Sequence, residues 1–589
     1  MEKASQEQVR DVQGTYDIVI ENLSWTYSGS KHPAIRNVSL RVRPGEVLVI
    51  TGPSGAGKTT LTRVMNGLIP HFYRGEMKGE AYVKGLRVKE YDVSVMASKV
   101  GLVFDNPANQ LFTSTVLEEL AFGPENYCLP RDEIIRRVNY ALQFSRLTGL
   151  ENKSPYLLSG GQQQACAIAA IVAMMPEILV LDEPTSNLDP EGTELVFNRV
   201  KEIAETQRKT LVIVEHKLDY VIPLADSLAV MNNGEIVAYG KPLEVLDKVE
   251  LMEELDLQIP HATEIAYWFR KKGQALAKIP VTIDEGVQFL KSMLNPKNLP
   301  RITASYVERD DPQPRGEVAV RCEDVWYQYK DGSMALKGVD IPAIYSGEFV
   351  GFIGKNGSGK TTTAKLLNGL YKPYKGRVLI FGRDTKNLSV RELASEVAYV
   401  AQIPDDQLFA KTVREELAFG PRNLGVPDEE VMQRVDAVSE ELELKPYLDI
   451  SPFTLSQGLK QRVVVASAVT MNPRILVVDE PTTGQDYARA AAMMELAKKL
   501  NEKGTTVIIV SHNMDLIASY CHRVFVFYDG KVIDSGIPRE VFQREEVLAR
   551  TSLKPPQVTS ICRRLADIGI PNNIITIPEM IEFLEKVVG

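Results

Sequence analysis

The sequence predicts an α/β protein of two tandem P-loop domains, each followed by a small C-terminal subdomain. The first observation behind this prediction is an internal repeat, because residues 51–60 read TGPSGAGKTT and residues 353–362 read IGKNGSGKTT. The second is that LVLDEPTSNLD at 179–189 returns as LVVDEPTTGQD at 476–486 with nearly the same spacing. Self-similarity on this scale indicates a duplicated domain. The third is that short apolar runs alternate with helical segments in each copy, which favours a largely parallel sheet.

Each predicted element follows from its local pattern. A short apolar strand runs into each glycine-rich loop, and a helix follows the loop. Two further strands consist of continuous apolar runs, as buried parallel strands do. Hairpins turn at Asn233-Gly234 and at Asp529-Gly530, dipeptides that favour two-residue turns. The predicted elements are a strand at 45–52, a helix at 58–68, strands at 176–184 and 210–216, and hairpins at 227–240 and 524–536.

The repeat continues beyond these core domains. IPHATEIA at 259–266 matches PPQVTSIC at 555–562, and a segment with apolar periodicity follows each. The region between the two copies is rich in proline and charge, as linkers are. We therefore expect an N-terminal tail at 1–14, a first core domain at 15–245 with its subdomain at 246–296, a linker at 297–316, and a second core domain at 317–540 with its subdomain at 541–589.

Composition excludes several classes of protein. Of 589 residues, 25% are charged and 44% are hydrophobic, which excludes disorder as the main state. The net charge of -9 disfavours a protein that coats nucleic acid. The five cysteines are scattered without a C-x-x-C pair, so we expect a reducing cytoplasm rather than a disulfide framework or a zinc ribbon.

Hydropathy gives no reason to expect a membrane-spanning segment. The longest apolar run, Ala165 to Met175, ends at Pro176 and falls short of the roughly 18 residues that a span requires. It predicts a buried helix instead. The N-terminal residues lack the basic-then-apolar pattern of a signal peptide. Docking onto a separate membrane protein stays compatible with these observations.

Two glycine-rich loops match G-x-x-x-x-G-K-[ST], and each lies between a predicted strand and a predicted helix. Glycines allow backbone N–H groups to surround phosphates, and the helix N-terminus adds positive potential. The lysine reaches the β- and γ-phosphates, and the first threonine binds Mg²⁺. A glycine turn with an exposed lysine is the alternative. The candidate ATP-binding residues are Gly52, Ser54, Gly55, Gly57, Lys58, Thr59 and Thr60, and Gly354, Asn356, Gly357, Gly359, Lys360, Thr361 and Thr362.

Two apolar strands end in adjacent acids. We expect Asp182 and Asp479 to help hold Mg²⁺, directly or through water. We expect Glu183 and Glu480 to orient the attacking water and to act as bases. A strand that ends at a solvated acidic turn is the alternative.

The segment Leu158-Ser-Gly-Gly-Gln162 gives the chain its family resemblance. With this LSGGQ signature ahead of the acidic strand, residues 15–245 and 317–540 resemble ABC-transporter ATPase domains. The resemblance implies that two such domains close head to tail, with each ATP between one P-loop and the opposite signature. It adds, as further expected site residues, the signature positions Ser159, Gly160, Gly161, Gln162, Ser456 and Gly458, the catalytic histidines His216 and His512, the metal and γ-phosphate positions Gln402 and Asp105, and the adenine-stacking positions Tyr27 and Tyr329. A core aromatic is an equal explanation for each tyrosine.

The two copies are not equivalent. The second signature reads Leu455-Ser-Gln-Gly-Leu459, Gln485 stands where the first copy has Leu188, and Asp105 stands where the second has Gln402. Because the implied pairing is crossed, all three departures fall on the site that contains Lys58. We therefore expect a degenerate site there and a hydrolytic site at Lys360, with neutral drift as the alternative. Ala165, where the second copy has Arg462, has no physical explanation.

The stretch NPxxQLF, followed by AFGP, resembles the ATPases of energy-coupling factor importers. It occurs at 106–112 with 121–124, and again, beginning at Pro404, at 404–409 with 418–421. The resemblance implies that Gln110–Phe112 and Gln407–Phe409 receive coupling helices of a transmembrane T component. Separate S components would select a vitamin, its precursor, cobalt or nickel.

This resemblance places the chain on the cytoplasmic face of a membrane, with ATP and Mg²⁺ as cofactors and without nucleic acid. Three alternatives stay open: an ordinary surface helix at the QLF stretch, a soluble twin ATPase acting on ribosomes, and the ATPase pair of a conventional ABC transporter. The scattered cysteines and the absence of a long basic linker argue against the ribosomal alternative.

Overall fold

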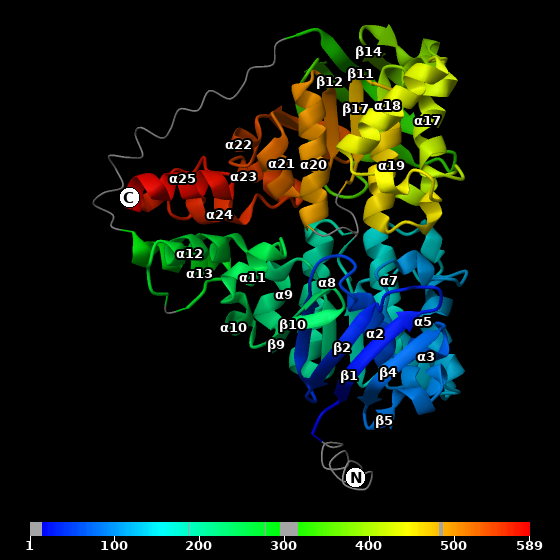
Figure 1. Cartoon of the computed structure of the whole chain (residues 1–589), viewed down its shortest axis with the longest axis vertical. Helices are drawn as coiled ribbons and strands as arrows, with labels where there is room; N and C mark the ends of the chain where they lie inside the picture. The colour runs from blue at the N-terminus through cyan, green and yellow to red at the C-terminus, as the bar shows by residue number, and fades with distance from the viewer. Residues whose placement is uncertain (1–14, 187, 277, 295–315, 482–486, 589) are drawn as a thin grey trace. The chain divides into compact units, whose positions relative to one another are not determined.

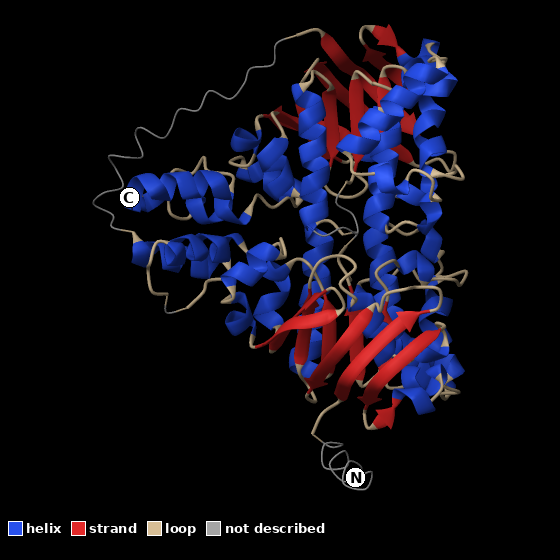
Figure 2. Cartoon of the chain, in the orientation of Figure 1, coloured by secondary structure: helices blue, strands red, loops and turns tan. Residues whose placement is uncertain are grey.

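The computed structural model describes residues 15–186, 188–276, 278–294, 316–481 and 487–588. The predicted tail at 1–14, most of the predicted linker and the position of Gln485 lie outside these ranges. The chain divides into two compact units, Met1–Gly286 with Asp486–Ala488, and Val287–Gln485 with Arg489–Gly589. Each unit contains its own strands flanked by helices (Figures 1 and 2).

Unit 1 is built around a six-stranded sheet in the order β10-β9-β3-β8-β7-β6. All neighbours pair in parallel except β9 and β10, which form the predicted hairpin around Asn233 and Gly234, both at positive φ. The strands are β3 (Val47–Thr51), β6 (Val100–Val103), β7 (Ile178–Asp182), β8 (Thr210–Val214), β9 (Ser227–Asn232) and β10 (Glu235–Gly240). The largely parallel α/β core that the sequence predicts is confirmed.

A second sheet, which the sequence patterns did not reveal, is antiparallel and has the order β2-β1-β4-β5. Its strands are β1 (Ile18–Tyr27), β2 (Ile35–Val42), β4 (Gly75–Val83) and β5 (Leu86–Arg87). Alternation along β3 shows how the layers pack, because Leu48 and Ile50 contribute to the core shared with β1 and β2, whereas Val47 and Val49 face the helical side. The six-stranded sheet that contains β3 is thus buried on both faces, as parallel sheets require.

The helices of unit 1 are α2 (Lys58–Met65), α3 (Leu68–His71), α4 (Val93–Ala97), α5 (Val116–Asn126), α6 (Arg131–Ser145), α7 (Gly160–Met174), α8 (Pro190–Glu202), α9 (Leu218–Val221), α10 (Pro242–Leu246), α11 (Val249–Glu254) and α12 (His261–Lys271). The next helix, α13 (Ile283–Met293), crosses the division between the units. Helix α2 ends three residues before the predicted limit because Gly67 adopts φ 83° and breaks the helix. The long apolar run at 165–175 forms most of α7, as predicted.

Unit 2 repeats this plan. Its sheets have the orders β12-β11-β14-β15 and β16-β17-β18-β13-β19-β20. The strands are β11 (Val318–Gln328), β12 (Met334–Tyr345), β13 (Phe349–Ile353), β14 (Lys375–Ile380), β15 (Arg383–Asp384), β16 (Val397–Val400), β17 (Ile475–Asp479), β18 (Thr506–Val510), β19 (Arg523–Tyr528) and β20 (Lys531–Gly536). The prediction of two tandem P-loop α/β domains is therefore confirmed.

The helices of unit 2 are α15 (Lys360–Leu367), α16 (Val390–Ala394), α17 (Val413–Leu424), α18 (Asp428–Glu441), α19 (Gln457–Val469), α20 (Tyr487–Glu502), α21 (Met514–Tyr520), α22 (Pro538–Val541), α23 (Glu545–Thr551), α24 (Gln557–Arg563) and α25 (Ile577–Val588). Within the described ranges, no helix combines the length and apolarity needed to cross a membrane.

Candidate functional site

The P-loops, the acidic residues, the histidines and the Asp105 and Gln402 positions lie at one edge of each parallel sheet, whereas the signature residues open helices α7 and α19. In unit 1 the P-loop follows β3, His216 follows β8, Asp182 and Glu183 end β7, and Asp105 follows β6. Since these strands are parallel neighbours, their carboxyl ends meet at the same edge, where open α/β sheets bind ligands. Unit 2 places its P-loop, His512, Asp479, Glu480 and Gln402 in the same way.

The P-loop of unit 1 curls around its own lysine. Lys58 Nζ donates to the carbonyl oxygens of Gly52 at 2.8 Å and Pro53 at 3.1 Å. Gly52 has φ 144°, and a Cβ there would lie 2.0 Å from the Met231 carbonyl oxygen, so only glycine fits. Gly55 has no atom within 4 Å of such a Cβ, which leaves that side of the loop open.

The P-loop of unit 2 has the same construction. Lys360 Nζ donates to the carbonyl oxygens of Gly354 at 2.7 Å and Lys355 at 3.0 Å. The helices that follow the two loops begin after Gly57 and Gly359, and within the described structure no side chain caps either one. Helix N-termini of this kind bind phosphates, so we expect each P-loop helix to present its first N–H groups to a ligand.

The acidic strand of unit 1 ends at a carboxylate that is 2% exposed. Asp182 Oδ2 accepts a hydrogen bond from Thr62 Oγ1 at 3.1 Å, and Oδ1 has no hydrogen-bond partner in the part of the chain that is described. Burial, followed by the negative charges of Glu183 and Asp105, raises the pKa of Asp182 to about 7. A buried, unsatisfied carboxylate oxygen next to further acids fits a divalent cation that prefers oxygen ligands.

The corresponding carboxylate of unit 2 is fully hydrogen-bonded. Asp479 Oδ1 accepts from Thr361 Oγ1 at 3.0 Å, and Oδ2 accepts from Tyr399 Oη at 2.8 Å. Burial raises the pKa of Asp479, while these two donors oppose the rise. The hydroxyl of Thr361 next to a carboxylate is a donor set that suits Mg²⁺.

Each candidate base is paired with the predicted histidine. His216 Nε2 lies 3.0 Å from Glu183 Oε1, and His512 Nδ1 lies 2.8 Å from Glu480 Oε2. Burial acts to raise the pKa of Glu480, but the attraction of His512 and then of Lys360 outweighs it and holds that pKa below its ordinary value. The carboxylate therefore stays ionised, as a proton acceptor must.

The backbone at both glutamates is strained in the same way. Glu183 has φ 47° and Glu480 has φ 50°, values that side chains other than Asn, Asp and Gly seldom adopt. Each glutamate N–H donates to the adjacent strand, to Val214 at 2.9 Å and to Val510 at 2.8 Å. Strain that neighbouring hydrogen bonds maintain is common at functional sites.

The two signatures differ in how they open their helices. In unit 1, Ser159 caps α7 and forms a capping box with Gln162, whose Oε1 accepts from Ser159 N at 3.1 Å. In unit 2, Leu459 stands in place of that glutamine, and Ser456 makes no side-chain cap on α19. The side chain of Gln457 lies outside the described part of the structure.

The last glycine of each signature meets a different neighbour. A Cβ on Gly161 would lie 3.6 Å from Leu188 Cδ2, an ordinary contact. A Cβ on Gly458 would lie 3.0 Å from Arg489 Nη1, so a guanidinium covers this glycine. Among the described residues, the degenerate signature thus has a guanidinium against its last glycine, where the first signature has a leucine.

The predicted adenine-binding tyrosines lie beside the P-loop helices. Tyr27 Oη lies 3.2 Å from Thr60 Oγ1, and Tyr329 Oη lies 2.8 Å from Thr362 Oγ1. Tyr329 is 37% exposed and meets Tyr371 edge to face. Both rings therefore lie next to the loops, and their predicted stacking on adenine stays a prediction.

Each unit also presents an exposed aromatic pair formed by its QLF and AFGP segments. Phe112 and Phe122 pack edge to face at 4.7 Å, and Phe409 and Phe419 do so at 4.5 Å. Phe112 and Phe409 are each 56% exposed. We call these the aromatic pairs of units 1 and 2.

Buried polar groups hold each aromatic pair in place. The buried Glu119 carboxylate accepts hydrogen bonds from Phe112 N and Thr113 N at 3.0 and 2.9 Å. Gln110 bridges to β6, because its Oε1 accepts from Phe104 N at 3.1 Å and its Nε2 donates to Leu102 O at 3.3 Å. In unit 2 the same contacts are made by Glu416 and Gln407.

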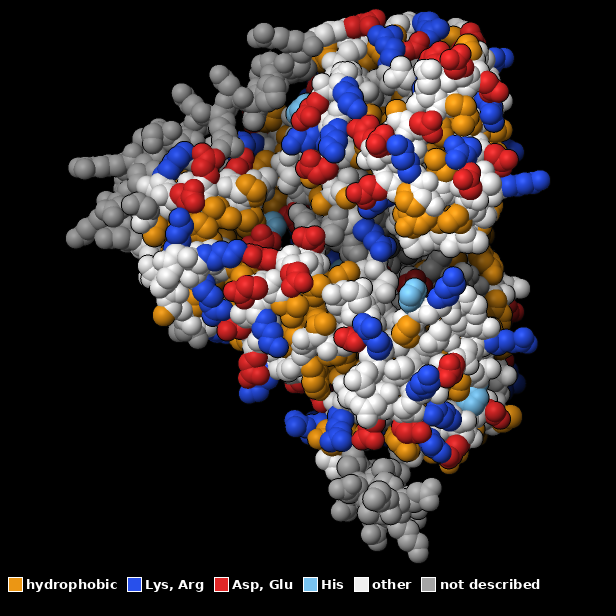
Figure 3. Space-filling model, in the orientation of Figure 1, with side chains coloured by type: hydrophobic (Ala, Val, Ile, Leu, Met, Phe, Trp, Pro, Cys, Tyr) orange, Lys and Arg blue, Asp and Glu red, His pale blue; other side chains and the backbone are white. Residues whose placement is uncertain are grey.

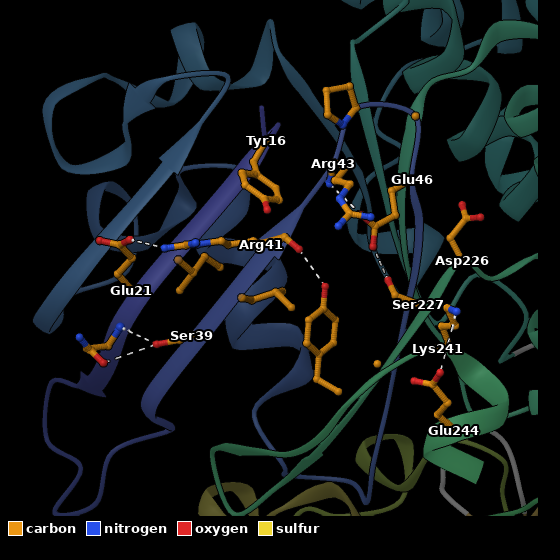
Figure 4. A pocket seen from close by; sticks show the side chains of 17 residues that line it. Tyr16, Glu21, Ser39, Arg41, Arg43, Glu46, Asp226, Ser227, Lys241 and Glu244 are labelled. Carbon is orange, nitrogen blue, oxygen red and sulfur yellow. Dashed lines mark hydrogen bonds and ion pairs between the residues drawn. The ribbon is translucent and has the colours of Figure 1, made fainter. Parts of the chain in front are cut away.

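A separate hollow of about 1100 Å³ in unit 1 lies among β1, β2, β9, β10 and the start of α10. Its polar side chains bond largely to one another (Figure 4). Arg41 pairs with Glu21 at 3.3 Å, Ser227 donates to Glu46, and Tyr239 Oη donates to the Arg41 carbonyl oxygen. We assign it no ligand.

Three residues near these sites escaped the sequence patterns, namely Thr62, Tyr399 and Arg489. No motif contains them. An alignment of the two copies would have identified them as positions at which the copies differ. The opposite copy has Ala364 in place of Thr62, Leu102 in place of Tyr399 and Gly192 in place of Arg489.

Comparison with known proteins gives matches over both units. The family profile described as ABC transporter matches residues 35–186 and 337–483. A protein of Caldanaerobacter subterraneus, named as an ABC transporter ATP-binding protein, is 42% identical over 579 residues, which are 97% of this chain and 99% of that protein. Similarly named proteins of Methanosarcina acetivorans and Enterococcus faecalis are 38% and 31% identical, and the matches cover 96% and 97% of this chain and 93% and 99% of those proteins.

Proposed function

The chain belongs to the ABC transporter family of ATP-binding proteins and is an ATPase, and from this premise we propose that it energises a membrane importer of the energy-coupling factor type. The observation that carries the proposal is the exposed aromatic pair of each unit. Contiguous exposed apolar side chains indicate an interaction site, whereas apolar side chains exposed singly are ordinary on protein surfaces. Two such surfaces, one in each ATPase unit, suit a partner with two docking helices.

The contacts behind the aromatic pairs support this interpretation over that of an ordinary surface helix. Glu119 and Glu416 are each 4% exposed, and burying a carboxylate is unfavourable unless hydrogen bonds compensate it. Here these bonds hold the loop that presents Phe112 or Phe409. An ordinary surface loop does not need a buried carboxylate to fix its shape, so these contacts favour a docking surface of defined shape.

The proposed ATP chemistry follows from the residues at the sheet edges. Lys58 and Lys360 would hold the β- and γ-phosphates. Thr59, Thr361, Asp182 and Asp479 would hold Mg²⁺, together with Asp105 or Gln402. When bound, Mg²⁺ neutralises negative charge on the phosphates. Glu183 and Glu480 orient a water and accept its proton, and His216 and His512 keep these carboxylates in place. Water then attacks the γ-phosphate, which leaves ADP and phosphate.

The two sites are proposed to differ in rate. In the head-to-tail pairing that the family resemblance implies, the Lys58 site would receive the degenerate signature and contain Asp105, whereas the Lys360 site would receive the intact one. The lost capping box at Ser456 supports this assignment. Loss of a single well-placed hydrogen-bond donor to a developing charge costs about 10²–10³ in rate.

ATP binding is proposed to close the two units and to move the docking surfaces, and hydrolysis at the Lys360 site to reopen them. The transported molecule would be a vitamin, a vitamin precursor or a transition metal chosen by a separate S component. The two surfaces would dock the T component at the cytoplasmic face of the membrane.

The ribosomal alternative requires a surface suited to RNA. On the face shown in Figure 3, acidic and basic side chains are interspersed over both units. RNA-binding proteins instead concentrate basic residues in a patch or stripe. Together with the net charge of -9, this pattern favours a protein partner. A conventional ABC transporter stays the nearer alternative.

Affinity purification of the full-length chain from its host tests the proposal. Recovery of polytopic membrane proteins that include an S component supports an energy-coupling factor importer, and recovery of ribosomes refutes it. Recovery of only a transmembrane subunit with an extracytoplasmic binding protein supports the conventional transporter. Phe112→Ser with Phe409→Ser is expected to abolish membrane recovery, whereas Val390→Ser, which changes an apolar side chain 52% exposed on α16, is the matched control.

A further inference from the structure

Tyr399 lies on β16, the strand next to the acidic strand of unit 2. Its backbone pairs with Val477 of β17, two residues before Asp479. From there its side chain extends along the ladder until Oη donates to Asp479 Oδ2 at 2.8 Å. The other carboxylate oxygen, Oδ1, accepts from Thr361 Oγ1 at 3.0 Å. The carboxylate is therefore held between two hydroxyl groups from different elements.

Unit 1 lacks the tyrosine of this arrangement. Leu102 occupies the place of Tyr399 and is buried in the apolar core. Asp182 accepts a hydrogen bond from Thr62, one turn further along the P-loop helix, where unit 2 has Ala364, and the P-loop threonine Thr59 also hydrogen-bonds to it. One oxygen of Asp182 has no hydrogen-bond partner among the described residues, whereas both oxygens of Asp479 have one.

The difference has a direct consequence for cation binding. A carboxylate that two donors fix in one rotamer does not lose rotational freedom when a metal binds. It also presents the same oxygen beside the P-loop threonine at all times. Groups that hydrogen-bond to metal-ligating carboxylates change metal affinity or activity by about 10–100-fold when they are removed.

We infer that Tyr399 is a positioning residue that fixes Asp479 beside Thr361 for Mg²⁺. We infer further that this hydrogen bond gives the Lys360 site a higher affinity for Mg²⁺ than the Lys58 site has. The inference rests on the proposed function, because it assumes that Asp479 and Thr361 hold the cation. As a positioning residue, Tyr399 is not proposed to bind the cation or ATP. It acts through the carboxylate of Asp479.

The experiment uses the full-length chain carrying Lys58→Ala, so that ATP binding reports on the Lys360 site. ATP binding is measured by calorimetry over a series of Mg²⁺ concentrations, and the half-saturating Mg²⁺ concentration is extracted. Tyr399→Phe removes the hydroxyl and keeps the ring. We expect this change to raise the half-saturating Mg²⁺ concentration about tenfold, with ATP binding in EDTA unchanged.

Tyr520→Phe is the matched control, because Tyr520 Oη donates to the Glu495 carboxylate at the same distance of 2.8 Å, away from the P-loop of unit 2. It is expected to change thermal stability without shifting the Mg²⁺ dependence. An equal Mg²⁺ dependence in both variants would overturn the inference while the ATP site stands. ATP binding that does not respond to Lys360→Ala would overturn the proposed site and the inference with it.

Discussion

Replacing Glu480 by Gln in one variant and Glu183 by Gln in another separates the two ATP sites with the smallest possible change. Both substitutions keep the shape of the side chain and remove its ability to accept a proton. A general base contributes about 10²–10⁴-fold to a reaction rate. If both sites turned over equally, each change would therefore remove half of the activity.

The structure predicts a different outcome. Within their own units the two glutamates share a nearby histidine and a similar positive φ, although His216 faces Glu183 with Nε2 and His512 faces Glu480 with Nδ1. The expected asymmetry comes from Asp105 and from the degenerate signature, and the hydrogen bond from Tyr399 to Asp479 is a further difference between the two sites. We expect Glu480→Gln to leave at most about one hundredth of the ATPase rate, and Glu183→Gln to keep more than half of it.

The assay is steady-state phosphate release by the full-length chain at saturating ATP. Thermal unfolding of each variant controls for loss of fold. Equal losses in the two variants would show that both sites hydrolyse ATP at similar rates. A larger loss in Glu183→Gln would reverse the assignment of the sites.

Three further predictions concern stability. Glu119→Ala leaves the Phe112 and Thr113 N–H groups without their buried acceptor, so urea unfolding is expected to show a loss of about 1–3 kcal/mol or more; a loss below this range would contradict the role given to the carboxylate. Gly123→Ala places a Cβ 2.4 Å from Met174 Cγ and is expected to cost about 1–3 kcal/mol, part of which Met174→Ala should restore if this clash is the cause. Hydrogen bonds from Arg87 hold the pKa of Glu80 below its ordinary value of 4.5, so Glu80→Gln should be less stable than the wild type at pH 7. The difference in unfolding free energy should disappear as the pH falls below 4.5 through the folded-state pKa, and a difference that is constant with pH would refute this.

Motifs with fixed spacing predicted most of the fold and of the candidate sites. The P-loops, the acidic strands and the hairpins at Asn233 and Asp529 are local patterns, and local backbone chemistry is enough to place them. The antiparallel sheet was missed because its strands carry exposed polar residues and because β1 pairs not only with the next strand, β2, but also with β4, which follows the P-loop and α2 in sequence. No local periodicity records such pairing.

The hydrogen bonds of the carboxylates could not be predicted for a related reason. Tyr399 and Asp479 are 80 residues apart and meet only because β16 and β17 are neighbours in the sheet. The same holds for Arg489 and Gly458, which lie on different helices. The sequence shows that the two copies differ at these positions. Only the fold shows that these residues contact the acidic-strand carboxylates and the last glycine of the signature.

The amides of Gln110 and Gln407 have a mechanical consequence. Each amide is hydrogen-bonded to the backbone at the end of the strand beside the acidic strand. The oxygen of Gln110 accepts from Phe104 N, next to Asp105, and the oxygen of Gln407 accepts from Ala401 N, next to Gln402. The loop that carries the exposed phenylalanine and the residue expected to sense the γ-phosphate are therefore joined by one side chain. A displacement of the loop at Phe112 or Phe409 would therefore act through this one amide on the backbone next to Asp105 or Gln402, and a displacement of that backbone would act on the loop in the same way.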